Sequence, residues 1–136
     1  GEERNSLKAD IQQADLTNTI HLLGHVDHVA RLLPAFDIIV LPSAKEGFPY
    51  VLLEAGLNSV AVAASRVGGV PDIITHNKNG LLFQNLSSTQ LCKNLLLLIQ
   101  DQGLRQRLGQ SLNATVTTNF TLTRLISETV EAYQLD

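Results

Sequence analysis

The sequence predicts an α/β fold built on a doubly wound parallel sheet. Two apolar runs without polar alternation, 37–41 and 60–64, suit strands that are covered on both faces. Stretches with helical spacing separate the runs, and strands that alternate with helices imply βαβ units with right-handed crossovers. In such sheets ligands bind beyond the carboxyl ends of the strands, so we expect a site in the loops that follow them.

Length, composition and charge limit the class of protein. The 136 residues are the size of one domain, and we expect a single domain over 1–136. Hydrophobic residues make up 44% and charged residues 17%, which suffices for a core and argues against disorder. The net charge of −3 offers no basic surplus for nucleic acid. No apolar run approaches the roughly 20 residues of a membrane span. The single cysteine, Cys92, excludes an internal disulfide and fits a reducing cytoplasm.

The remaining elements follow from hydrophobic periodicity and turn residues. Strands are expected at 19–23, 37–41, 60–64 and 81–83. Helices are expected at about 4–14, 28–33, 50–57, 70–74, 87–100, 104–112 and 121–133. Pro34 should stop the second helix, and the serines at 87 and 88 should cap the fifth. Cys92 and the run 95–99 are interpreted as the buried side of that fifth helix.

One loop carries most of the predicted chemistry. It runs from Glu46 to Pro49, after the strand at 37–41, and opens the helix at 50–57. A helix start presents free N–H groups and a partial positive charge of about half a unit, which suits a phosphate. Gly47 lets a ligand approach the backbone, and Pro49 fits the first helical turn, where its missing N–H costs nothing.

Two carboxylates, Glu46 and Glu54, bracket this phosphate seat with seven residues between them. Each carboxylate can accept hydrogen bonds at both oxygens and so bind a vicinal diol. Their expected separation suits two sugars joined by a diphosphate, and looks too long for a hydrolase pair at roughly 5–9.5 Å. The residues alone leave open that both are solvated charges near a helix end.

Other candidate features give weaker predictions. Three histidines, His21, His25 and His28, lie close in sequence, but we expect them on different elements and without a fourth ligand of telling spacing. We therefore predict no metal site. Lys45 is interpreted as a surface charge, and 68–69 as a turn that would face the ligand cleft in this fold.

The segment from Glu46 to Ala55, EGFPYVLLEA, resembles the E-x7-E motif of glycosyltransferase family 4, whose members are retaining enzymes of the GT-B fold. Further blocks resemble the same family in the same order: TIHLLGHV at 19–26, AFDIIVLPS at 35–43, VGGVPDII at 67–74 and NGLL at 79–82. The closing stretch, NFT at 119–121 followed by a helix, is also similar. The resemblance covers essentially the whole chain.

This resemblance implies the Rossmann-like C-terminal half of a GT-B fold, without its first strand segment and without the N-terminal acceptor domain. It implies a hexosyltransferase that takes sugar from a UDP-, GDP- or ADP-sugar with retention and needs no metal or other cofactor. Glu46, the candidate catalytic residue, would bind hydroxyls of the transferred sugar, and Glu54 the ribose. The other implied donor-binding residues are Gly47, Phe48, Pro49, Tyr50 and Val51 at the diphosphate, with Gly24 and Val26 beside the base.

Several departures from the family pattern limit what the chain is expected to do alone. The family's Arg and Lys at the diphosphate lie on a segment before this chain, and no residue here matches them. The usual Gly-x-Pro appears as Asn58-Ser59-Val60, so that the Gly and the Pro are both lost. Asp72 replaces a Glu, and Leu122 replaces an aromatic residue. The start lacks a Met, so we expect a cut inside a longer protein and an inactive isolated chain.

Absent regions would then supply contacts to a glycan or lipid-linked acceptor and any association with a membrane. We expect a cytoplasmic location, including the inner face of the membrane for the longer protein. The principal alternative is a non-catalytic nucleotide-sugar-binding or interaction module of the same fold. A sugar epimerase of related fold comes next, and a flavodoxin-like receiver or Rossmann dehydrogenase fits least, because the chain has no G-x-G-x-x-G.

Overall fold

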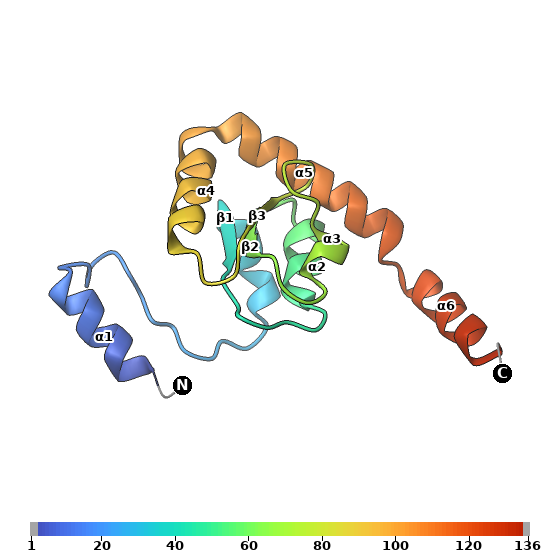
Figure 1. Cartoon of the computed structure of the whole chain (residues 1–136), viewed down its shortest axis with the longest axis horizontal. Helices are drawn as coiled ribbons and strands as arrows, with labels where there is room; N and C mark the ends of the chain where they lie inside the picture. The colour runs from blue at the N-terminus through green and yellow to red at the C-terminus, as the bar shows by residue number, and fades with distance from the viewer. Residues whose placement is uncertain (1–2, 135–136) are drawn as a thin grey trace.

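A three-stranded parallel sheet in the order β1-β2-β3 forms the centre of the computed structural model (Figure 1). The strands are β1 (Ile38–Leu41), β2 (Ala61–Ser65) and β3 (Leu81–Phe83). The structure describes residues 3–134, so 1–2 and 135–136 of the predicted single domain lie outside the described residues. The parallel pairing and the helices between the strands confirm the predicted α/β, Rossmann-like class.

Helices connect the strands and continue beyond the last of them. They are α1 (Arg4–Gln13), the 3-10 turns η1 (Val29–Arg31) and η2 (Leu33–Ala35), α2 (Tyr50–Leu57), α3 (Val70–Ile73), α4 (Ser88–Gln100), α5 (Gln102–Asn119) and α6 (Leu122–Gln134). α4 begins where predicted, because the Ser87 side chain accepts a hydrogen bond from the Gln90 N–H. α5 begins in the same way, at Asp101.

The strand β2 is the buried centre of the domain, and each of its residues is shielded from solvent. Val62 and Ala64 face a cluster that includes Leu52 of α2 and Leu112 of α5. Ala61 and Ala63 face a second cluster that includes Leu98 of α4 and Leu108 of α5. Helices therefore cover both faces of the sheet, and α5 contributes to both layers (Figure 1).

Three predicted elements differ in the structure. Residues 19–23 are not a strand, since none of the three described strands pairs with them. Pro34 does not stop a helix but lies within η2, because proline is tolerated in a first helical turn. α5 extends seven residues beyond the predicted end at 112, where Val116 continues the apolar stripe that packs on α2. The C-terminal end of α5 thereby reaches the start of α2.

Two elements are less buried in the structure than the sequence predicts. β1 lies at the edge of the described sheet and pairs only with β2, so its residues are half-buried and Val40 is exposed. In α4, only Leu98 of the run 95–99 is fully buried, and Cys92 is exposed rather than buried. A helix presents one face at a time to the sheet, so consecutive leucines cannot all be buried there.

The last helix forms as predicted but is not packed. α6 extends away from the body of the domain (Figure 1), and its apolar stripe is exposed in the described chain. None of the helices within residues 3–134 is both long enough and apolar enough to span a bilayer.

The two-layer core predicts a large difference between two leucines of the C-terminal helices. Leu112→Ala opens a cavity between α5, α2 and β2, and should lower the free energy of unfolding by about 2–5 kcal/mol. The matched control is Leu122→Ala, because Leu122 is 72% exposed and should change that free energy by less than about 0.5 kcal/mol. Urea denaturation of both variants measures the difference, and equal losses would contradict the packing described here.

Candidate functional site

The loops that follow the three strands meet at the carboxyl edge of the sheet. Ser65, the last residue of β2, donates a hydrogen bond from its hydroxyl to the carbonyl of Ser43 in the loop after β1. Asn85, after β3, donates from its amide to the Ala44 carbonyl at 3.2 Å. The Arg66 N–H donates to the Phe83 carbonyl at 2.8 Å. The structure therefore brings the predicted loop into contact with both other strand ends.

The turn at Gly68 and Gly69 is part of this site rather than a separate connection. Gly69 donates its N–H to the Gly47 carbonyl at 2.9 Å. A Cβ on Gly68 would collide with the Glu46 carbonyl, and a Cβ on Gly69 would collide with the Gly47 carbonyl. Gly68 also has a φ of +46°, which side chains rarely adopt. Both glycines are thus required by a backbone-to-backbone contact with the Glu46 loop.

The start of α2 has the properties expected of an anion seat. Pro49 is the N-cap and is buried, so it lies one position before the first helical turn in which it was predicted. No described side chain accepts a hydrogen bond from the N–H groups at the start of this helix. The Leu52 N–H donates to the Pro49 carbonyl, and Pro49 itself has no N–H. Of the predicted run 47–51, four residues can therefore offer a backbone donor to a ligand.

Glu46 and Glu54 lie on the loop and on the middle turn of α2, and both are half-buried. Within residues 3–134 the ion pairs are Arg105 with Asp37 and Arg124 with Glu128, and His25 forms a hydrogen bond with Asp27. Neither glutamate takes part in these pairs, so both carboxylates are available to a ligand. Asp72 adds a third carboxylate, because its Oδ2 atom lies 3.7 Å from where a Cβ of Gly69 would stand.

Aromatic side chains support the loop from the side of α5. The ring of Phe48 lies 5.8 Å from the ring of Tyr50 in an edge-on arrangement, and 5.8 Å from the ring of Phe120 at the end of α5. Pairs at this spacing are favourable beyond their buried area. Phe48 therefore packs on the end of α5, whereas Tyr50 is 70% exposed.

The predicted base-side residues have different neighbours. Gly24 adopts a φ of +74°, and a Cβ there would meet the Arg4 guanidinium of α1 at 3.3 Å. Arg4 also donates to the Leu22 carbonyl at 3.0 Å. The contacts found here for 22–24 are thus with α1, and Val26 is half-buried. The placement of Gly24 and Val26 beside a base stays a prediction.

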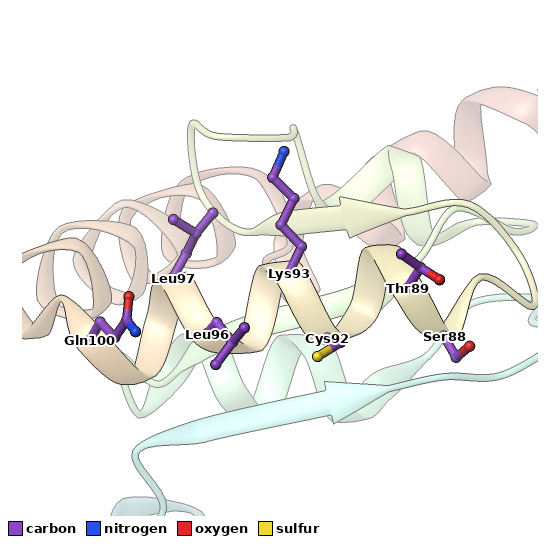
Figure 2. A pocket seen from close by; sticks show the side chains of 7 residues that line it. All are labelled: Ser88, Thr89, Cys92, Lys93, Leu96, Leu97 and Gln100. Atoms are coloured by element: carbon purple, nitrogen blue, oxygen red, sulfur yellow. The ribbon is translucent and has the colours of Figure 1, made fainter.

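An open groove of about 630 Å³ lies along α4, away from the Glu46 loop. Figure 2 shows that α4 alone supplies its lining, with Lys93 at one edge of the lined face and Cys92 and Leu96 at the other. The lining contains none of the residues predicted to bind the donor. Among residues 3–134 no group of His, Cys, Asp or Glu is arranged to hold a metal ion.

The fold and this edge define a class: a Rossmann-like α/β domain with an uncapped helix start between two available carboxylates. Residues 1–114 match the family model described as Glycosyl transferases group 1. The chain belongs to this family.

Curated relatives agree with this assignment. The chain is 30% identical to N-acetyl-alpha-D-glucosaminyl L-malate synthase of Bacillus anthracis over 118 residues, which cover 87% of this chain and 31% of the relative. It is 34% identical to an alpha-1,3-N-acetylgalactosaminyltransferase of Campylobacter jejuni that acts on N,N'-diacetylbacillosaminyl-diphospho-undecaprenol, over 70% of this chain and 25% of that protein. The chain thus spans about a third or less of these relatives.

Solved structures place the chain in the C-terminal domain of such proteins. The C-terminal domain of a group 1 glycosyl transferase, LpcC, of Francisella tularensis matches with a TM-score of 0.79 and 32% identity, over 89% of this chain and 64% of that one. Anabaena HepE in complex with UDP-glucose matches with a TM-score of 0.85 and 25% identity, over 94% of this chain and 36% of that one. The sheet and its helices are those of a GT-B C-terminal domain.

The tight contact between the two loops predicts that Gly69 and Gly47 differ in their tolerance of alanine. Gly69→Ala should displace the Gly47 carbonyl and lower the free energy of unfolding by about 1–3 kcal/mol. Gly47→Ala is the matched control, because nothing lies within 4 Å of the added Cβ and the change should stay below about 0.5 kcal/mol. Urea denaturation gives both values, and an unperturbed Gly47 amide NMR signal in Gly69→Ala would refute the contact.

Proposed function

We propose that the chain binds a nucleotide-diphosphate sugar at the carboxyl edge of its sheet and serves as the donor half of a retaining glycosyltransferase of family 4 type. The observation that carries this proposal is the uncapped start of α2, held between Glu46 and Glu54 by the Gly68–Gly69 turn. The family match and the UDP-glucose complex of HepE support the same ligand class.

The roles of the residues follow from the chemistry of the ligand. The free N–H groups of Gly47, Phe48, Tyr50 and Val51 hold the diphosphate and the adjoining sugar, because an uncapped helix start favours negative charge. Glu46 accepts hydrogen bonds from hydroxyls of the transferred sugar, and Glu54 from those of the ribose. Catalysis then consists mainly of positioning and of stabilising the charge of the leaving diphosphate, without a metal of the protein's own.

In this proposal the acceptor is bound by another part of a longer protein. The Campylobacter relative acts on a lipid-linked diphosphate, and we propose a glycan or lipid-linked acceptor for the present chain as well. Acceptor contacts, and a cytoplasmic reaction at the inner face of a membrane, would come from the part of the relatives that this chain does not span.

Separate roles for the two glutamates predict different losses of affinity. Glu46→Gln should weaken binding of a nucleotide sugar about tenfold to a hundredfold, and leave the free nucleoside diphosphate unaffected, because its partner is the sugar. Glu54→Gln should weaken both ligands by a similar factor, because its partner is the ribose. NMR titration with UDP-, GDP- and ADP-glucose, and with the three diphosphates, measures these affinities.

The matched control for this experiment is Glu131→Gln on α6, an exposed glutamate outside the site. It should bind as the wild type does. Wild-type chain that shows no shifts at residues 46–54 with any of the six ligands at millimolar concentration would refute the proposed function. Equal effects of Glu46→Gln on sugar and diphosphate would refute the separate roles.

Retention of configuration predicts the stereochemistry of the product. In the proposed reaction the diphosphate leaves from the face that the acceptor hydroxyl approaches, and it takes up the proton of that hydroxyl. A chimera of this chain with the N-terminal part of a group 1 relative should therefore form a product with the donor's anomeric configuration. The coupling constant of the anomeric proton in the NMR spectrum shows the configuration. An inverted product contradicts the proposal, and donor binding without transfer favours the non-catalytic module.

A further inference from the structure

Ser65 is a buried polar residue whose place in the fold suggests more than packing. It ends β2, and its side chain is fully shielded from solvent. The hydroxyl lies 2.5 Å from the Ser43 carbonyl and 3.3 Å from the Leu41 carbonyl. A buried hydroxyl costs free energy unless it is hydrogen-bonded, so these two acceptors fix where the Ser65 side chain points.

The position of Ser65 in the sheet explains what its hydroxyl holds. Leu41 is the last residue of β1 and pairs with Ala64, so Ser65 stands where the pairing between β1 and β2 ends. Beyond this point no backbone hydrogen bonds of the sheet connect the two strands. Instead, the Ser65 hydroxyl donates a hydrogen bond to the carbonyl of Ser43, the second residue of the loop. The hydroxyl thereby sets the direction in which the chain leaves the sheet.

From Ser43 the chain has only three residues to reach Glu46, a span of at most about 10 Å. Two other hydrogen bonds hold this loop. The exposed Asn85 side-chain amide donates to the Ala44 carbonyl, and the Gly69 N–H donates to the Gly47 carbonyl. Of the side chains that donate these hydrogen bonds, that of Ser65 is the fully buried one. Ser43 is therefore the place, three residues before Glu46, at which a buried side chain holds the loop.

We propose that Ser65 is a positioning residue of the nucleotide-sugar site, and that its hydroxyl sets the loop so that Glu46 meets the transferred sugar. This inference rests on the proposed function. Ser65 acts through Glu46 and does not touch the ligand. Its contribution should therefore appear in the affinity for the sugar part and not in the affinity for the nucleotide.

The experiment compares Ser65→Ala with Glu46→Gln, and both with the double variant Ser65→Ala/Glu46→Gln. The ligands are UDP-, GDP- and ADP-glucose and the free diphosphates. Ser65→Ala should lower the affinity for the nucleotide sugar about tenfold and that for the diphosphate less than about twofold. In the double variant the loss should not exceed that of Glu46→Gln alone, because residues that act as a unit are not additive.

Asn94→Ala is the control for a merely structural role. Asn94 is also buried and also donates to a strand carbonyl, that of Leu82, but it belongs to α4 and does not touch the loop. Asn94→Ala should lower stability without changing either affinity. If Ser65→Ala does not fold, Ser65→Cys takes its place, since it keeps a side chain of similar shape with a much weaker donor.

The outcomes separate this inference from the proposed function. Wild-type chain that binds none of the sugars overturns both. If the wild-type chain binds but Ser65→Ala loses equal affinity for the nucleotide sugar and the diphosphate, the role of Ser65 is overturned and the proposed function stands. Additive losses in the double variant do the same. The inference is supported if Ser65→Ala loses affinity for the nucleotide sugars but not for the free diphosphates, and if it causes no further loss when Glu46 is already replaced by Gln.

Discussion

The candidate site depends on a backbone contact between two loops at the carboxyl edge of the sheet. The carbonyls of Glu46 and Gly47 lie so close to Gly68 and Gly69 that a side chain on either glycine would collide with a carbonyl. The hydrogen bond from Gly69 to Gly47 fixes the same contact. Because both partners are backbone, this contact does not depend on a side-chain rotamer, and the start of α2 stays open between its two carboxylates.

The fully buried strand β2 makes this contact possible. Small residues on the α4 side of β2 let that helix pack closely, while Val62 packs against α2. The pairing between β1 and β2 then places the end of β1 beside Ser65. At the other side of the loop, the rings of Phe48 and Phe120 connect it to the end of α5. A rigid sheet and two helices thus hold a loop that is itself irregular.

Much of this arrangement could be predicted from local pattern. α2, β3 and the start of α4 form where periodicity and capping residues indicate them, because these signals act over a few residues. Strand 19–23 failed because β-prone residues form a strand only beside a partner strand. The buried Asn79 also escaped prediction. It appears in the sequence as part of a turn, yet it bonds to Thr115 of α5, 36 residues further along the chain.

Local sequence was enough to predict the fold class and to propose a chemistry for one loop, since glutamates around a glycine at a helix start are close together in the chain. The sequence also predicts that the turn at 68–69 faces the ligand cleft, but it does not show that Gly68, Gly69 and Ser65 contact that loop. They lie some 20 residues away along the chain, and their role comes from the parallel pairing that brings strand ends together. The sequence also could not show which side of α4 is exposed, because that depends on which face of the helix packs against the sheet.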